Sequence, residues 1–340
     1  MSKSDINLIV EANVPFVRGL LDPYANVRYL QPEEITPAEV RDCDGMIIRT
    51  RTRCDEGLLV RSKCKMVATA TIGLDHINLD YCRRTGVTVV NAPGCNAAAV
   101  AQYVMAAIMH VINRPLAGYT IAVIGVGHVG SIVERWAKGF DMKVLRYDPP
   151  RQRAEGGDDW ADLETIAREA DIITFHTPLT REGEDKTFHM VDEAFMSRLR
   201  RAPIMINSAR GEIFDTEAVI AAKDAGKIGP LIIDCWEDEP RIDTDLLART
   251  AIATPHIAGY SREGKIRASQ TVLDAITTFF MLPRVTIDAP LPPAPARTVS
   301  LDGLMGSFDP MPISEALKAS PEIFEKQRNG YSYRSEAPEG

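Results

Sequence analysis

Thr120–Asp148 reads TIAVIGVGHVGSIVERWAKGFDMKVLRYD, and this stretch decides the fold class of the chain. Its first residues form an apolar run up to Ile124 that is too short for a helix, which predicts a buried parallel strand. The sequence GVGHVG follows at Gly125–Gly130, then a helical pattern to about Gly139, then a second strand at Lys143–Tyr147. This order of strand, glycine-rich turn, helix, strand and acid is typical of a dinucleotide-binding site.

Each small or acidic residue of this motif has a predicted role. Gly125 allows the tight turn, Gly127 lets the backbone approach a pyrophosphate, and Gly130 lets the helix pack on the strand. The N–H groups at the start of the helix would hold the phosphates. Asp148 ends the second strand, where its carboxylate can accept hydrogen bonds from a ribose diol and would repel a 2′-phosphate, which favours NAD over NADP. Arg151 and Arg153 weaken this preference, because they lie close to Asp148 in the sequence.

Length and composition limit the class of protein. A chain of 340 residues has room for two or three domains, and its 45% apolar and 25% charged content is ordinary for a globular protein. The formal net charge of −8 argues against a general affinity for nucleic acid. An anionic substrate would therefore need a local basic pocket.

The cysteine pattern and the apolar runs predict the cellular compartment of the protein and whether it enters a membrane. Six cysteines are scattered without a CxxC pair, so we expect free thiols in a reducing compartment, the cytoplasm. The N-terminus lacks the pattern of a signal peptide. The longest mostly apolar run, Ala97–Ile112, is too short to span a bilayer comfortably and is predicted to be a buried helix. We therefore expect no membrane partner.

Short apolar segments alternate with helical stretches along the chain, which predicts parallel α/β layers. In the first part, a helix is expected at about Pro15–Leu21 and strands at Asn7–Val10, Asp44–Arg49, Lys65–Ala70 and within Thr85–Val90. In the second part, further strands are expected at Asp171–Phe175, Ile204–Asn207, Leu231–Asp234 and Ile252–Thr254.

The predicted fold class is α/β, with two Rossmann-like parallel-sheet domains and a short C-terminal segment. A long helix at Ser261–Phe280 is expected to return to the first unit, so residues 1–95 and 257–282 form a discontinuous substrate-binding domain. Residues 96–256 form the NAD-binding Rossmann domain.

Residues 283–340 form the C-terminal segment, for which we expect a role in dimerisation. The segment opens with a proline-rich linker, Pro283–Pro295. A strand at Thr298–Leu304 and short helices at Ser314–Ala319 and Pro321–Gln327 are predicted to follow it.

Three polar sequences follow predicted strands of the second part: NSARG at Asn207–Gly211, DCWEDEP at Asp234–Pro240 and TPHIAGY at Thr254–Tyr260. Ligands of open α/β sheets bind beyond the carboxyl ends of the strands, so an arginine, a carboxylate and a histidine are expected to meet there. Each of them alone is more often structural: a surface-turn arginine, a solvated loop acid or a packed histidine. Together, beside a dinucleotide motif, they favour catalysis.

These motifs carry a resemblance. GVGHVG, HTPL at His176–Leu179 and the three strand-end sequences occur in the same order in the D-isomer-specific 2-hydroxyacid dehydrogenases, which the chain resembles over about residues 5–290. Narrower signs, found at Ala92–Asn96 and in Lys186, Thr187 and His189, are similar to a member that acts on a small phosphorylated 2-hydroxy acid. The C-terminal segment looks shorter than the dimerisation domain of better-known members.

The resemblance implies the roles of individual residues. The implied catalytic set is Arg210, Glu239 and His256. The implied cofactor-binding set is Gly125, Gly127, His128, Val129, Gly130, Asp148, Thr177, Ser208, Ala209, Arg210, Asp234 and Gly259, with NAD as the cofactor and no metal. The implied substrate-binding residues are Thr50, Thr71 and Tyr260.

A substrate phosphate needs local positive charge in an acidic protein. Arg49-Thr50-Arg51-Thr52-Arg53 places arginines at alternate positions, so an extended backbone would point all three to one side. This favours Arg49, with Arg51 or Arg53, as the phosphate ligand, against the alternative of a solvated basic edge. Arg334 is a weaker candidate.

Two alternatives remain open from the sequence. The chain can be another 2-hydroxyacid dehydrogenase, acting on phosphoglycerate or as a hydroxypyruvate reductase. It can also be a binding protein of another class, because this fold family includes an NAD(H)-sensing corepressor. In each case we expect a homodimer.

Overall fold

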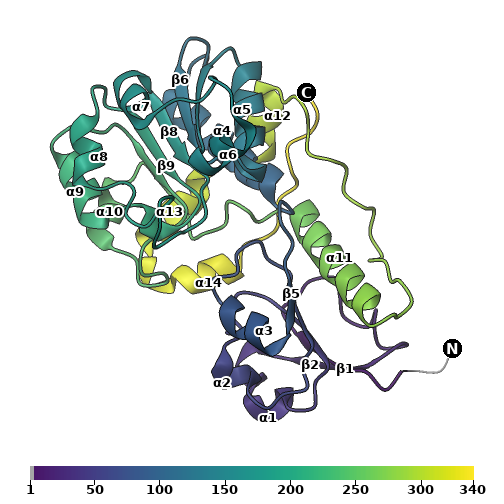
Figure 1. Ribbon diagram of the computed structural model, residues 1–340. Coiled ribbons are helices and arrows are strands. Elements are labelled where there is room, and N and C mark those ends of the chain that lie inside the picture. The colour runs from purple at the N-terminus through teal and green to yellow at the C-terminus, as the bar shows by residue number, and fades with distance from the viewer. Residues whose placement is uncertain (1–3) are drawn as a thin grey trace. The chain divides into compact units, whose positions relative to one another are not determined.

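The computed structural model describes residues 4–340, which divide into two compact units (Figure 1). Unit 1 comprises the residues up to Asn96 together with Arg262–Ala294. Unit 2 comprises Ala97–Ser261 and Pro295–Gly340. Each unit contains one parallel sheet, so the predicted α/β class with two parallel-sheet domains is confirmed.

The sheet of unit 1 has the strand order β2-β1-β3-β4-β5. Its strands are β1 (Asn7–Glu11), β2 (Asn26–Leu30), β3 (Gly45–Ile48), β4 (Met66–Thr69) and β5 (Thr88–Val90). Successive side chains of a strand point to opposite faces, so both faces are apolar. Leu8 and Val10 pack in the same cluster as residues of α11 (Arg262–Phe279), whereas Ile9 packs with residues of α2 (Glu56–Leu59) and α3 (Leu79–Thr85) on the other face. The short elements η1 (Pro32–Glu34) and α1 (Pro37–Val40) complete the unit.

The sheet of unit 2 has the order β11-β10-β9-β8-β6-β7. Its strands are β6 (Thr120–Ile124), β7 (Lys143–Tyr147), β8 (Ile172–Phe175), β9 (Ile204–Asn207), β10 (Leu231–Ile233) and β11 (Ile252–Ala253). The connecting helices are α4 (Ala97–Ile112), α5 (His128–Gly139), α6 (Pro149–Glu155), α7 (Leu163–Glu169), α8 (Glu193–Arg198), η2 (Gly211–Ile213), α9 (Thr216–Asp224) and α10 (Thr244–Arg249). The chain leaves β6 toward β7 on one side and later adds β8 on the other. This reversal is the point at which ligands bind in doubly wound sheets.

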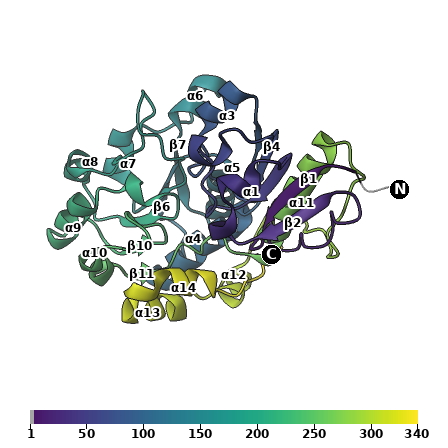
Figure 2. The same ribbon diagram turned by 90° about the horizontal axis from the view of Figure 1, so that it is seen from below.

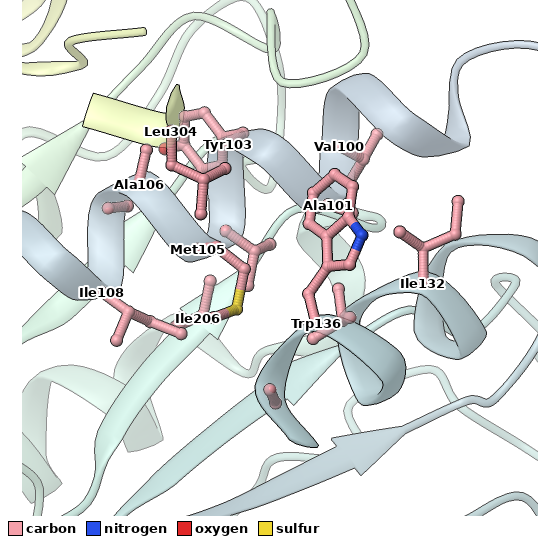
Figure 3. Close-up of a cluster of buried hydrophobic side chains, with 14 of the residues drawn as sticks. Val100, Ala101, Tyr103, Met105, Ala106, Ile108, Ile132, Trp136, Ile206 and Leu304 are labelled. Carbon is pink, nitrogen blue, oxygen red and sulfur yellow. The ribbon is translucent and has the colours of Figure 1, made fainter. Parts of the chain in front are cut away.

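Helices cover both faces of the second sheet. On one face, Tyr103 and Met105 of α4 and Trp136 of α5 pack in a cluster with Ile206 of β9 (Figure 3). On the other face, Ile166 of α7, Phe195 of α8 and Val219 of α9 pack in a second cluster with Phe175 of β8 and Ile233 of β10. The central strands are therefore buried on both sides, which explains their continuous apolar sequences.

The C-terminal segment contains α12 (Leu301–Ser307), α13 (Met311–Ala319), η3 (Pro321–Ile323) and α14 (Phe324–Asn329). Its first residues, up to Ala294, belong to unit 1, and from Pro295 onward it packs within unit 2. Leu304 of α12 lies beside Tyr103 (Figure 3). Helix α13 lies beside the edge strand β11 (Figure 2), where Ser314 Oγ accepts a hydrogen bond from Ala253 N at 2.9 Å. The segment therefore completes the core of this unit.

Three expectations for local structure are wrong or incomplete. The predicted strand at Thr298–Leu304 is instead the start of α12, which Ser300 caps by accepting from Gly303 N at 3.1 Å. The predicted helix at Pro15–Leu21 is a series of turns, because Phe16 has a left-handed φ of 63° that no α-helix accommodates. The edge strand β2 was not predicted. Among residues 4–340, no helix is long and apolar enough to cross a bilayer.

Candidate active site

The glycine turn after β6 has the geometry that the motif requires. Gly125 has a left-handed φ of 86°, and a Cβ there would lie 2.8 Å from the carbonyl carbon of His176. A Cβ on Gly130 would lie 2.0 Å from Gly125 O, so only glycine lets α5 start this close to the strand. Gly127 is the N-cap of α5, and a Cβ there would meet nothing within 4 Å. The backbone at the helix start, which includes His128 and Val129, is therefore open to a phosphate group.

Asp148 follows β7 and joins the glycine turn to α6. Its Oδ2 accepts from Val126 N at 2.8 Å and its Oδ1 accepts from Arg151 N at 3.0 Å. A carboxylate has about four acceptor positions, so both oxygens can still accept from a ribose hydroxyl.

The arginines after Asp148 are paired with other groups. Arg151 donates to Val126 O, to Ser131 Oγ at 3.2 Å and to Glu155 Oε1 at 2.6 Å. Arg153 pairs with Asp185. Two positive charges that could have attracted a 2′-phosphate are thus partly neutralised by carboxylates of this chain.

Two buried hydroxyl groups lack a protein partner. Thr177 Oγ1 follows β8 and Ser208 Oγ follows β9, and neither makes a hydrogen bond among the described residues. A buried hydroxyl without a partner costs free energy, so such groups indicate that a polar ligand completes them. Together with the open helix start and Asp148, they fit a bound dinucleotide.

His256 and Glu239 form a hydrogen-bonded pair. His256 Nδ1 lies 2.8 Å from Glu239 Oε2, and Glu239 Oε1 accepts from Trp236 N at 2.9 Å. His256 has a left-handed φ of 56°, and its N–H donates to Asp234 O at 2.9 Å and to Thr254 O at 3.0 Å. A left-handed histidine is a strained residue that its surroundings must hold in place. Its second ring nitrogen, Nε2, points away from Glu239.

Glu239 is ionised beside the histidine. Burial alone would raise the pKa of Glu239, but the charge and hydrogen bond of His256, the Trp236 N–H and the charge of Arg328 together lower it. An ionised Glu239 accepts a hydrogen bond from the Nδ1–H group, and this fixes the tautomer in which Nε2 can act as a base.

Asp234 fixes the loop that carries His256. Its Oδ1 accepts from Thr254 Oγ1 at 2.6 Å and from Ile257 N at 2.8 Å, and its Oδ2 accepts from Ala258 N at 3.0 Å. Burial raises the pKa of Asp234, while the charge of His256 and these hydrogen bonds oppose the rise. Asp234 was predicted only as a cofactor ligand, because a sequence does not show which loop a buried acid will hold.

The loop continues through Gly259 to Tyr260. Tyr260 N donates to Ile257 O at 2.8 Å, which closes a turn that contains Gly259. The Tyr260 ring packs against the rings of Tyr331 and Tyr333 at centroid distances of 6.2 and 6.1 Å. The predicted substrate residue Tyr260 is thus in contact with the C-terminal segment.

Arg210 joins the pair through the loop after β9. Asn207 holds this loop, because its Nδ2 donates to Arg210 O at 2.8 Å and its Oδ1 accepts from Ala209 N at 3.2 Å. A Cβ on Gly211 would lie 1.9 Å from the carbonyl carbon of Trp236, so glycine is required where the two loops touch. The structure therefore brings the loops of Arg210, Glu239 and His256 together, as predicted from their positions at strand ends.

Cys235 adds a third donor atom beside the pair. The donor atoms of Cys235, Glu239 and His256 all lie within 4.8 Å of one another. Burial, with the charges of Asp234 and Glu239, raises the pKa of the Cys235 thiol, and Arg210 opposes this. A cation would have to displace the thiol proton and the His256–Glu239 hydrogen bond, so we assign no metal here.

Unit 1 contains the other predicted substrate residues. Arg49 and Thr50 follow β3, Thr71 follows β4, and these two strands are neighbours in the sheet. Arg49 Nη1 donates to Asn13 O at 3.0 Å, and Thr71 Oγ1 lies 2.7 Å from Thr69 Oγ1.

The expectation of three aligned arginines is wrong. The extended backbone ends at Ile48, and residues 50–52 form a turn, so alternate positions no longer share a side. Arg53 pairs with Asp55 at 2.9 Å. The turn is organised by the buried Glu11, whose Oε2 accepts from Arg49 N and Thr52 Oγ1, both at 2.8 Å.

Comparisons with known proteins identify the family. Residues 97–258 match the NAD-binding domain of the D-isomer-specific 2-hydroxyacid dehydrogenases. Over 338 residues the chain is 42% identical to an erythronate-4-phosphate dehydrogenase of Bacteroides thetaiotaomicron, with 97% of each chain covered. The chain belongs to the D-isomer-specific 2-hydroxyacid dehydrogenases.

Further comparisons agree with this assignment. An erythronate-4-phosphate dehydrogenase of Cronobacter sakazakii is 37% identical over 88% of this chain and 80% of that protein. The structure of a D-lactate dehydrogenase of Aquifex aeolicus complexed with NAD and lactic acid is 26% identical, with a TM-score of 0.68 over 81% of this chain and 95% of that one. The TT0316 protein of Thermus thermophilus shares the fold, with a TM-score of 0.70 at 23% identity over 82% of this chain and 99% of that one. The cofactor of this family domain is NAD.

Proposed function

We propose that this 2-hydroxyacid dehydrogenase oxidises 4-phospho-D-erythronate to (R)-3-hydroxy-2-oxo-4-phosphooxybutanoate with NAD, a step of pyridoxal 5′-phosphate biosynthesis. The observation that carries the proposal is the 42% identity to the Bacteroides erythronate-4-phosphate dehydrogenase over 97% of both chains. The named relatives favour this reaction over phosphoglycerate oxidation, hydroxypyruvate reduction and a corepressor role.

The proposed chemistry uses three side chains of unit 2. His256 Nε2 takes the proton of the C2 hydroxyl as the C2 hydrogen leaves as hydride, and Glu239 stabilises the imidazolium through Nδ1. The guanidinium of Arg210 binds the substrate carboxylate and the oxygen at C2, a planar arrangement that suits its paired donors. Bound NAD supplies the hydride acceptor.

Cofactor binding is assigned to unit 2. The start of α5 holds the pyrophosphate, Asp148 holds the adenosine ribose, and Thr177 and Ser208 complete their hydrogen bonding on the cofactor. Ala209, Asp234 and Gly259 shape the same site through the loops that they hold. The paired arginines after Asp148 support NAD over NADP.

Arg49, Thr50, Thr71 and Tyr260 are the proposed substrate-binding residues. Arg49 is the proposed phosphate ligand, because its side chain is held beside the end of β3 by Asn13 O. We further propose a homodimer, and a cytoplasmic location in agreement with six free, buried cysteines.

A panel of 2-hydroxy acids assayed with NAD tests the proposal. We expect the largest kcat/KM for 4-phosphoerythronate, measured with and without an added 2-oxo acid acceptor so that tightly held NADH does not conceal turnover. A larger value for 3-phosphoglycerate would reassign the substrate. Binding of NADH without turnover of any acid would favour the corepressor alternative. Sedimentation velocity tests the dimer.

The phosphate assignment has its own test. Arg49→Ala should lower kcat/KM for 4-phosphoerythronate by roughly tenfold or more, since a hydrogen bond to a charged group contributes about 1.5–3 kcal/mol. Activity on plain erythronate should barely change. Arg53→Ala, at an exposed arginine that pairs with Asp55, is the matched control. Equal losses on both substrates would show that Arg49 does not hold the phosphate.

A further inference from the structure

The C-terminal segment places a mostly buried arginine against the His256–Glu239 pair. Arg328 Nη1 lies 3.8 Å from Glu239 Oε2, and the exposed fractions of the two side chains are 17% and 18%. The same oxygen faces His256 Nδ1 at 2.8 Å. A partly buried charge pair is screened much less than a surface pair, so the guanidinium acts on this carboxylate.

Helix α14 holds Arg328 in place. Phe324 at the start of the helix is 1% exposed and packs in the same core cluster as Leu317 of α13. Gln327 Nε2 donates to Ala316 O at 3.1 Å and to Ser320 O at 3.0 Å. The residue before Arg328 is thus fixed to α13, and the guanidinium is not a mobile surface group.

Several charged or titratable groups surround the pair. Arg328 also interacts with the Tyr260 hydroxyl and with Glu325 of its own helix. Arg328 Nε is buried and makes no hydrogen bond in residues 4–340. The other groups that face the pair are Asp234 and Cys235 after β10 and Arg210 after β9. Arg328 Nη1 is in contact with the Glu239 carboxylate itself.

The position of Arg328 opposes the effect of Glu239 on the histidine. A buried carboxylate beside an imidazole favours the imidazolium, whereas a cation that shares the same oxygen disfavours it. We propose that Arg328 is a positioning residue of the active site: by sharing Glu239 Oε2 with His256, it limits how strongly the carboxylate retains a proton on the histidine. This inference rests on the proposed role of His256 as the base of the dehydrogenase.

The proposal has a consequence for turnover. His256 must take a proton from the substrate in each oxidation and release it before the next. A histidine held too firmly as imidazolium would be protonated before substrate binds at neutral pH, and the base would be lost. Arg328 thus gives the C-terminal segment a role in setting the pH range of activity.

A histidine titration by NMR tests the proposal without substrate. The His256 ring resonance is the one absent from His256→Asn. In Arg328→Met its titration midpoint should move upward by roughly half to one pH unit, because a neighbouring cation has been removed. In Arg328→Lys the shift should be smaller. Lys326→Met removes an exposed cation from the same helix and should cause no shift.

Kinetics provide the second measurement. The acidic limb of the pH profile of kcat/KM should move upward by the same amount in Arg328→Met, with the plateau of kcat retained within about threefold. An unchanged midpoint would overturn the proposal, and so would an unchanged acidic limb with a raised KM, which would make Arg328 a substrate ligand. If Arg328→Met does not fold, Arg328→Gln, which also removes the positive charge, carries the test, and an unchanged midpoint there overturns the proposal. Because the titration needs no turnover, failure of the proposed reaction would be seen separately, as an inactive wild-type enzyme.

Discussion

The histidine–carboxylate pairs of His189 and His256 in unit 2 have similar nitrogen–oxygen distances and different surroundings. His189 Nε2 lies 2.6 Å from Glu237 Oε1, and His256 Nδ1 lies 2.8 Å from Glu239 Oε2. The other ring nitrogen of His189 faces Asp215 at 3.7 Å, so acids flank that ring on both sides. The geometry of a pair therefore does not identify a base, and the proposal that His256 is the base is supported instead by the loops of Arg210 and Asp234 beside it.

The first prediction concerns the base itself. His256→Asn should lower kcat by roughly 10²–10⁴, because the C2 hydroxyl loses its proton acceptor. NADH binding, measured by fluorescence, should remain nearly intact. His189→Asn is the matched control and should keep kcat within about twofold. A retained kcat in His256→Asn would remove the histidine from catalysis.

The second prediction concerns the carboxylate. Glu239→Gln should move the acidic limb of the pH–rate profile downward, because an amide no longer favours the imidazolium. This direction is opposite to the one expected for Arg328→Met, so the two variants separate the two charges. Glu237→Gln, in the pair with His189, should leave the profile in place. An unchanged limb in Glu239→Gln would contradict the role given to this residue.

At the scale of single residues, the sequence predicts which residues form the site better than it predicts the contacts that those residues make. Gly125 and Gly130 could be assigned because their roles lie within one turn. The need for glycine at 211 and the role of Glu11 depend on contacts with Trp236 and with the Arg49 loop, which are distant in the sequence. The sequence also contains no signal that Arg328 lies against Glu239.

At the scale of elements, periodicity works where an element is buried on both faces. The strand Ile204–Asn207, all of whose residues are buried, was predicted with its observed bounds. Periodicity fails for β2, an edge strand whose burial alternates weakly. It also fails for Pro15–Leu21, where Val17 and Leu21 are buried at helical spacing although the backbone forms no helix. Two apolar residues four apart show that both face the core, and not how the backbone brings them there.

Arg334 holds the C-terminal segment against the rest of unit 2, residues 97–261. Its Nε donates to Gln102 Oε1 at 2.9 Å, its guanidinium nitrogens donate to four backbone carbonyls, and its plane lies 4.2 Å from the Phe308 ring centroid. The carbonyls are those of Ala99, Ile257, Ala258 and Tyr260. The guanidinium is fully engaged with its own chain, which argues against the earlier expectation that it contacts the substrate.

The third prediction follows from these contacts. Arg334→Met should lower the free energy of unfolding by roughly 2–4 kcal/mol, because buried carbonyls lose their donor and each such loss costs about 1–3 kcal/mol. Urea unfolding measures the change. Arg297→Met, at an exposed arginine of the same segment, should cost less than about 0.5 kcal/mol. Equal small losses in the two variants would show that the segment is held by its apolar contacts instead.

At the scale of the whole molecule, the net charge of −8 and the local chemistry of the proposed sites predict opposite behaviour toward anions. The acidic total predicts no affinity for polyanions, yet the proposed substrate and cofactor are both anionic. The fold resolves this difference locally, with open helix N–H groups and with arginines placed at strand ends. Composition therefore excludes classes of partner, while the position of a few residues decides which small anions bind.

The last prediction concerns the stability of the fold in acid. His176 follows β8, and its Nε2 lies 3.0 Å from Thr174 Oγ1. Burial lowers the pKa of His176 from its ordinary value of 6.5 to about 3. Between these two values the unfolded chain binds a proton that the folded chain does not, so stability is lost as the pH falls below 6.5.

The size of this loss can be measured by difference. Wild-type protein should lose about 1.4 kcal/mol more than His176→Gln between pH 7.5 and pH 5.5, because one pKa unit corresponds to about 1.4 kcal/mol. Glutamine can keep a hydrogen bond to Thr174 and does not titrate. Urea unfolding of both proteins at the two pH values gives the difference directly. Equal losses in the two proteins would mean that His176 takes up its proton in the folded state, and the acid sensitivity of the fold would then lie with other groups.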